Sequence, residues 1–176
     1  MFDTVVFNRI LDGAIDISAL RGKGQFYATH IQRDEIGKTP NLQRRQALVG
    51  VFNRVTERKA ATESFVLDVS RLDEAKLSGD NVVPTESAVW DVSVWDQAKW
   101  GDENGLYSSV KAELDALNKN KANNVQDALI AETAIKNRFV LVTDDSDLRT
   151  VSTKFGGKCV DTKQLASGLG SWETGK

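Results

Sequence analysis

The stretch NNVQDALIAETAIKNRFVLVTDDSDL, residues 123–148, decides which fold this chain can form. Its first half predicts a helix, because apolar residues recur at the spacing that places one helix face in a core. These residues are Val125, Ala128, Leu129 and Ile135. Asparagine precedes the pattern, as is common at helix starts, so Asp127 is expected in the first turn.

The second half of the stretch predicts a buried strand that ends in carboxylates. Residues 139–142 form a short apolar run, and Thr143 then leads to three acids, Asp144, Asp145 and Asp147. In parallel α/β proteins, ligands bind in the crevice formed by strand ends and the helices beside them. We therefore expect at least two carboxylates in one cleft, which favours a bound hard cation.

The bulk composition indicates one globular domain. The chain has 176 residues, of which 40% are hydrophobic and 27% charged, ordinary values for such a domain. We expect a single domain over residues 1–165, with an insert around 64–104 and a loose tail over 166–176. The insert carries Trp90, Trp95 and Trp100, which either stack on unpaired bases or pack the insert onto the domain.

Several classes of protein are disfavoured by what the sequence contains. Cys159 is the only cysteine, so a disulfide framework or a thiolate zinc site cannot be built. His30 is the only histidine and is interpreted as a packing or local hydrogen-bonding residue. No apolar run approaches the roughly 18 residues of a membrane span, and no export signal is recognisable. We expect a cytoplasmic protein that does not enter a membrane.

The remaining segments predict alternating strands and helices before and after the insert. Strands are expected over 2–7, 25–28 and 158–160, and helices over 8–14, 29–36, from Thr39-Pro40 onward, along Leu106 to Leu117, and over 146–155. In the helix after Pro40, the residues expected in the core are Leu48, Val51, Phe52 and Val55.

This order of elements would gather acids that lie far apart in the sequence. If strands 2–7 and 139–142 are parallel neighbours, Asp3, Asp127 and Asp145 meet near one edge of the sheet, and the helix after the second strand brings Glu35. Clustered carboxylates raise one another's pKa, and a divalent cation is the usual resolution. Oxygen ligands suit Mg²⁺ or Mn²⁺, and one or two such ions would promote hydrolysis of a phosphodiester by water.

The same residues resemble those of PIN-domain nucleases, the family that includes the ribonuclease toxins of bacterial toxin–antitoxin pairs and relatives of flap endonucleases. The resemblance covers most of the chain and is weakest over 64–104. It rests on four segments: FDT with Asp3, THIQRDEI with Glu35, DALIAETA with Asp127, and VTDDSDL with Asp145 and Asp147.

The resemblance implies a three-layer α/β/α sandwich with a mainly parallel central sheet, a site for one or two Mg²⁺ or Mn²⁺ ions, and cleavage of RNA. It implies Asp3, Glu35, Asp127 and Asp145 as catalytic metal ligands. Asp147 is expected as a further ligand, and Thr143 and Asp144 as auxiliary residues. One departure is Val5, which stands where the family commonly has Asn or Ser. A small antitoxin partner and a homo-oligomer both remain open.

Basic residues offer candidate contacts to the RNA phosphates. They are Arg21, Lys23, Arg44, Arg45 and Arg54. A phosphoaspartate enzyme would need a second acid at Val5, and a response-regulator receiver would need more chain after VTDDSD, so both are disfavoured. The alternative that stays open is a non-catalytic PIN-like module that binds nucleic acid or protein.

Overall fold

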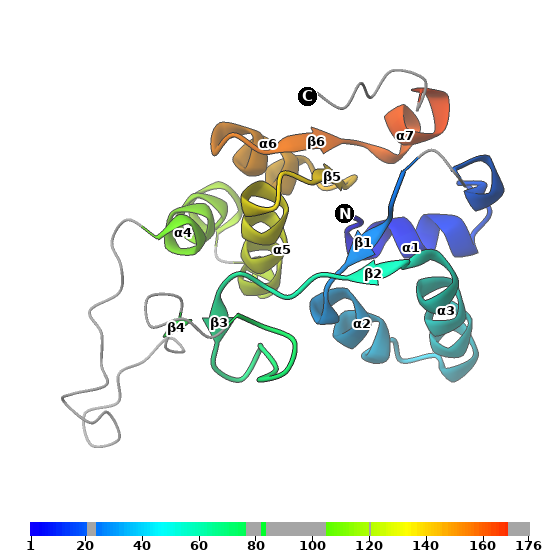
Figure 1. The fold of residues 1–176 in the computed structure, drawn as a ribbon, viewed down its shortest axis with the longest axis horizontal. Coiled ribbons are helices and arrows are strands. Elements are labelled where there is room, and N and C mark those ends of the chain that lie inside the picture. Colours follow the sequence, from blue (N-terminus) through cyan, green and yellow to red (C-terminus); the bar gives the residue numbers. More distant parts are fainter. Residues whose placement is uncertain (21–23, 77–81, 84–104, 120, 169–176) are drawn as a thin grey trace.

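The computed structural model describes residues 1–20, 24–76, 82–83, 105–119 and 121–168. This part of the chain is a mixed α/β fold with seven α-helices and three small parallel sheets of two strands each (Figure 1). The helices are α1 (Thr4–Leu11), α2 (His30–Gly37), α3 (Leu42–Val55), α4 (Leu106–Asn118), α5 (Asn124–Lys136), α6 (Ser146–Lys154) and α7 (Thr162–Gly168), and Ile17–Leu20 forms a 3-10 turn. The strands are β1 (Tyr27–Ala28), β2 (Arg58–Lys59), β3 (Phe65–Val66), β4 (Val82–Val83), β5 (Val140–Val142) and β6 (Lys158–Val160).

The N-terminal residues lie between two of the strand pairs. β1 pairs with β2, β3 with β4, and β5 with β6. Phe2 forms a single parallel bridge with Val142, and its backbone N–H donates to Tyr27 O at 3.0 Å. Asp3 N donates to Val142 O at 3.0 Å. Across the described residues these pairs remain separate two-stranded sheets, and the extended central sheet expected from the sequence is not seen.

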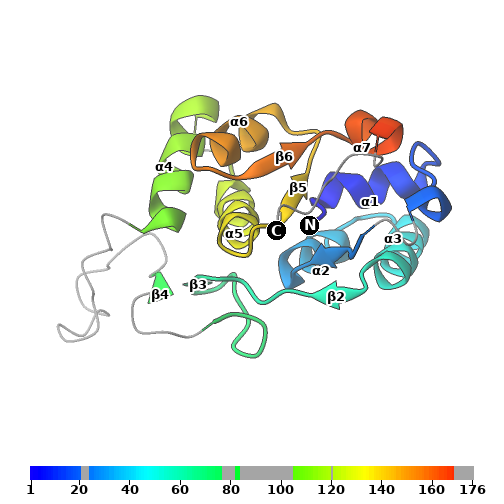
Figure 2. The same ribbon diagram turned by 45° about the horizontal axis from the view of Figure 1, so that its top comes forward.

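Strand side chains alternate between two hydrophobic cores. Leu141 packs with α4, α5 and α6, whereas its neighbour Val142 packs with α1, α2 and α3. Tyr27 and Ala28 divide in the same way, because successive strand residues point to opposite faces. Figure 2 shows the two groups of helices on either side of β5 and β1. The pocket described below lies where these two halves meet.

The expected strand over residues 2–7 is wrong beyond its first residues. The chain turns into helix α1 at Thr4, with Asp3 as the N-cap whose carboxylate accepts from Thr4 N. A short apolar run does not distinguish a strand from a buried helix by periodicity alone. Here packing favours the helix, because Phe7 is fully buried with its ring centroid 5.1 Å from that of Phe52. The early end of the strand is what places Asp3 at a helix N-terminus.

The local signals for α2 and α6 are confirmed. Thr29 caps α2 in a capping box with Gln32, as its hydroxyl and position predict. α6 ends at Lys154, shortly before Gly156, which adopts φ +84°, a conformation that favours glycine. The predicted start of α3 is wrong, because Asn41 rather than Thr39 is its N-cap.

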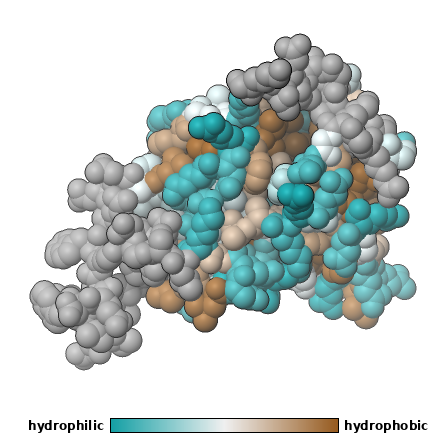
Figure 3. Space-filling model, viewed as in Figure 1, coloured by the Kyte–Doolittle hydropathy of each residue, from teal (hydrophilic) through white to brown (hydrophobic). Residues whose placement is uncertain are grey.

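The buried face of α3 is confirmed, whereas that of α4 is only partly as expected. Leu48, Val51, Phe52 and Val55 are all buried. In α4, Val110 and Leu114 are buried but Leu117 is 49% exposed. The face shown in Figure 3 is largely hydrophilic with smaller hydrophobic areas. None of the described helices combines the length and hydrophobicity needed to cross a bilayer.

At the C-terminus, α7 continues to Gly168, three residues into the tail expected to be loose. Part of the expected insert forms β3 and the turns that follow it, up to Lys76. The insert's Trp90, Trp95 and Trp100 lie outside the described residues, as do residues 169–176.

Candidate active site

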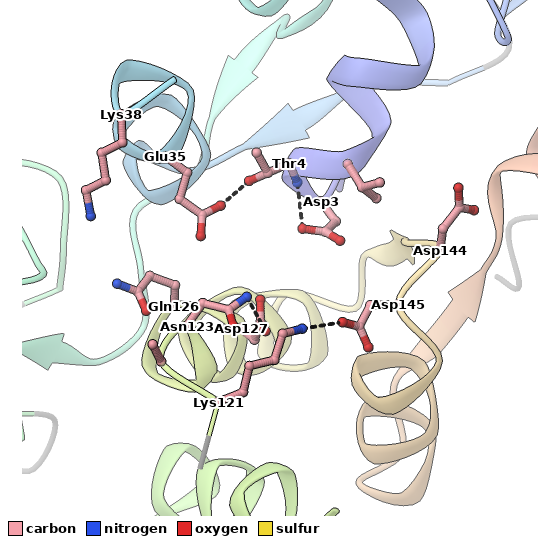
Figure 4. Close-up of a pocket in the computed structure, with 12 residues that line it drawn as sticks. Asp3, Thr4, Glu35, Lys38, Lys121, Asn123, Gln126, Asp127, Asp144 and Asp145 are labelled. Carbon is pink, nitrogen blue, oxygen red and sulfur yellow. Dashed lines mark hydrogen bonds and ion pairs between the residues drawn. The ribbon is translucent and has the colours of Figure 1, made fainter. Parts of the chain in front are cut away.

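Four acids from four separate segments line one pocket. Asp3 caps α1, Glu35 lies in α2, Asp127 in the first turn of α5, and Asp145 caps α6. The pocket has a volume of about 730 Å³ and is shown in Figure 4. Its other lining residues are Thr4, Val5, Lys38, Lys121, Ala122, Asn123, Gln126 and Asp144. The structure therefore brings together the four carboxylates that the sequence singled out.

Asp3 is buried and held by two hydrogen bonds. It is 7% exposed, and its carboxylate accepts hydrogen bonds from Thr4 N at 2.6 Å and from Thr143 Oγ1 at 2.7 Å. Burial raises the pKa of Asp3, and these two hydrogen bonds oppose that rise. Thr143 Oγ1 also accepts from Asp145 N at 3.0 Å. The one hydroxyl of Thr143 thus contacts two acidic residues, the carboxylate of Asp3 and the backbone N–H of Asp145. An auxiliary residue of the site would make such contacts.

Glu35 is joined to the same helix terminus. Thr4 Oγ1 donates a hydrogen bond to Glu35 Oε2, which links the start of α1 to α2 across the pocket (Figure 4). Burial raises the pKa of Glu35, and the charge of Asp3 adds to the rise while the hydrogen bond from Thr4 opposes it. Val5, the departure from the PIN pattern, lines the pocket but contributes no side-chain polar group.

Asp127 has the most strongly perturbed carboxyl group. It is 6% exposed, and its Oδ2 accepts from Asn123 Nδ2 at 3.0 Å. Burial raises its pKa to about 8, and the charges of Asp3 and Glu35 contribute. A carboxyl whose pKa is strongly raised by burial and by specific charged neighbours in a pocket marks a candidate functional site.

Asp145 is the one acid of the four whose pKa is lowered. Burial opposes its ionisation, but the backbone N–H of Leu148 and the ammonium of Lys121 outweigh it. Asp145 Oδ1 accepts from Asp147 N at 2.9 Å and from Leu148 N at 3.0 Å as the cap of α6. Its Oδ2 accepts from Lys121 Nζ at 3.0 Å.

Lys121 is a charged residue of the pocket that the sequence reasoning missed. It lies in the connection between α4 and α5, and Figure 4 shows its ammonium between Asp127 and Asp145. The hydrogen bond to Asp145 raises the pKa of Lys121, with the charges of Asp127 and Asp147 in the same direction and burial opposed. The only signal in the sequence was a lysine six residues before Asp127, which no local pattern distinguishes from Lys119 in the same segment KNKANN.

Asp144 and Asp147 do not join the four acids. Asp144 lies at the pocket edge, but its carboxylate accepts from Thr162 N and Oγ1 and from Arg9 Nε at 3.0 Å. Figure 4 shows Asp144 turned away from Asp3. Asp147 lies in the first turn of α6 and is not among the residues that line the pocket. In this arrangement neither carboxylate is placed beside Asp127.

The predicted RNA-contacting arginines lie away from the pocket lining. Arg44 donates to both carboxylate oxygens of Asp12, at 2.9 and 3.0 Å, and Arg45 donates to Gly37 O. Arg54 is exposed in the last turn of α3. Arg21 and Lys23 lie outside the described residues.

His30 is buried at the start of α2, as a packing residue would be.

The donor chemistry of the pocket fits a hard divalent cation, since the acids offer oxygen ligands only. The acids are too widely spaced to bind an ion in this arrangement, because no three His, Cys, Asp or Glu side chains of the described residues are positioned to hold one. The positive charge nearest to Asp145 is the ammonium of Lys121.

Comparisons with protein-family models, curated protein sequences and solved structures found no match.

Proposed function

We propose that this protein is a divalent-metal-dependent endoribonuclease of the PIN type, acting in the cytoplasm. The observation that supports it best is the convergence of Asp3, Glu35, Asp127 and Asp145 from four segments on one pocket. Asp3, Asp127 and Asp145 lie at the starts of helices, close to the strand ends where α/β proteins bind ligands. The pKa values of Asp3, Glu35 and Asp127 are raised, chiefly by burial and further by the charges of neighbouring acids, and a bound cation would oppose both effects.

The proposal includes a three-layer α/β/α sandwich in which the parallel strand pairs act as one central sheet. Residues 1–3 support it, because they hydrogen-bond to Tyr27 on one side and to Val142 on the other. The alternation of Leu141 and Val142 between two cores is the pattern of a strand covered on both faces.

Three of the four acids have distinct parts in the proposed site. Mg²⁺ or Mn²⁺ bound here would lower the pKa of a water and offset negative charge on a phosphate. Asp127 would become a charged ligand, since a bound cation would offset the burial and the neighbouring negative charges that raise its pKa. Asp3, fixed by Thr4 and Thr143, would hold its position throughout. Glu35 would lie on the α2 side of the RNA phosphate.

A non-catalytic PIN-like module that binds nucleic acid or protein is the second candidate. It is favoured by the ion pair between Lys121 and Asp145, which already supplies one cation to the pocket. It is also favoured by the spacing of the acids, which leaves no three of the described carboxylates around one point.

Incubation of the protein with RNA and with single-stranded DNA, in Mn²⁺ and in EDTA, separates the two candidates. We expect Mn²⁺-dependent cleavage of RNA, and a loss of about 100-fold in the Asp127→Asn variant, since changes to residues that only support metal ligands already cost about 10–100-fold. Asp73→Asn is the matched control, because Asp73 is exposed and distant from the pocket lining. Binding of RNA without cleavage in Mn²⁺ would favour the non-catalytic module.

A further inference from the structure

Lys121 places an ammonium group beside one carboxylate of the acidic pocket, that of Asp145. Its Nζ lies 3.0 Å from Asp145 Oδ2, the oxygen that α6 does not use for its cap. The Lys121 side chain is 45% exposed, so it reaches the pocket from the solvent side. Because the lysine stem is flexible and its ammonium is a strongly hydrated point charge, this contact can open without disturbing the fold.

The charge of Lys121 acts on all four acids. It lowers the pKa of Asp3, Glu35, Asp127 and Asp145. Burial remains the largest influence on each of these groups, and it opposes their ionisation. A single ammonium therefore partly offsets the negative charge of the whole pocket.

Lys38 is the other lysine of this pocket, and it differs in one respect. Within the described residues, no carboxylate lies within ion-pair distance of its Nζ, although its charge also favours ionised Glu35. The two lysines thus carry the same charge at the same pocket, but only Lys121 contacts one of the four acids.

We propose that the Lys121 ammonium is a built-in counter-ion that holds the place of a divalent cation and must leave Asp145 Oδ2 when the cation binds. The inference rests on the proposed metal site and adds the residue that sets its affinity. With the ammonium at Asp145, no three carboxylates of the described residues are placed to hold one ion, so the proposal requires the acids to move together around the cation. The affinity for metal is then lower than the acids alone would give.

The inference predicts that removing the ammonium tightens metal binding. At a partly exposed site, a unit charge about 5 Å from a divalent ion changes the binding constant of that ion by about tenfold. Lys121→Met keeps most of the stem and removes the charge, so the dissociation constant for Mn²⁺ should fall by about tenfold. Lys38→Met removes the same charge without breaking an ion pair to Asp145, and its effect should stay within about threefold.

The test is calorimetric titration of Mn²⁺ into the full chain at pH 7.5, with wild type, Lys121→Met, Lys38→Met and Asp127→Asn compared. Circular dichroism checks the fold of each variant, and Lys121→Gln provides a second neutral side chain. Tighter binding in both Lys121 variants than in Lys38→Met supports the proposal. If wild type binds Mn²⁺ and Asp127→Asn does not, equal or weaker binding in the Lys121 variants overturns the counter-ion proposal. The proposed metal site is then retained. Absence of binding in wild type and both Lys121 variants overturns the metal site and the counter-ion together.

Discussion

Replacing Asp127 with asparagine should stabilise the metal-free protein, and increasingly so as pH rises. The pKa of this carboxyl is raised from 3.8 to about 8 by burial and by the charges of Asp3 and Glu35. Because the pKa is higher in the folded than in the unfolded state, the folded protein binds more protons between these values. The contribution of this one carboxyl to stability is therefore fully present below pH 3.8 and is lost as pH rises toward 8.

The size of the effect follows from the difference between the two pKa values. At 1.36 kcal/mol per pH unit, the free energy of unfolding is lowered by at most about 1.6 kcal/mol at pH 5 and about 4 kcal/mol at pH 7. Water that enters the pocket reduces these limits, so we expect a gain of about 2 kcal/mol for Asp127→Asn at pH 8. For a chain of this length, that corresponds to about 4–8 °C in Tm. Asparagine can still accept the hydrogen bond from Asn123.

The assay is urea denaturation of wild type and Asp127→Asn in EDTA at pH 5, 7 and 8.5. The variant should be more stable at pH 7 and 8.5, with a difference that narrows toward pH 5. Asp73→Asn, an exposed change of the same chemistry, should show no such trend. A variant that is no more stable than wild type at pH 8.5, or a difference that does not depend on pH, would refute the account of Asp127.

Two further substitutions test the support of the site and its surroundings. Thr143→Val removes a buried hydroxyl that donates to Asp3 and accepts from Asp145 N; it should cost about 1–3 kcal/mol in urea denaturation and weaken Mn²⁺ binding in the same titration. Unchanged stability would show that the hydroxyl does not hold the two acids. Arg44→Glu should weaken RNA binding. It should also make the negative slope of log K against log salt shallower, by about one for each phosphate that residue 44 no longer binds. An unchanged slope would mean that Arg44 serves only its ion pair with Asp12.

The elements whose signals are local were predictable from the sequence. The capping threonine of α2, the apolar spacing of α5 and the run that forms β5 each depend on residues within a few positions of one another. The proximity of Asp127 and Asp145 followed from these elements, because a helix start and a strand end were expected at one edge. The same reasoning brought Asp3 into the group, although the strand after it was wrong.

The features that could not be predicted depend on contacts between distant segments. Residues 4–7 have side chains suited to a strand, but the packing of Phe7 on Phe52 makes them helical. The hydrogen bond from Thr143 to Asp3 joins residues 140 positions apart. Lys121 has no local pattern that marks it, and only its position 3.0 Å from Asp145 shows its importance.

The central claim is that side chains from four segments form a site for a divalent cation, and anomalous diffraction from crystals grown with Mn²⁺ tests it most directly. We expect one or two anomalous peaks in the pocket, with carboxylate oxygens of Asp127 and Asp145 as ligands and the Lys121 ammonium moved away from Asp145. A pocket without a peak at saturating Mn²⁺, with Lys121 still bound to Asp145, would contradict the account.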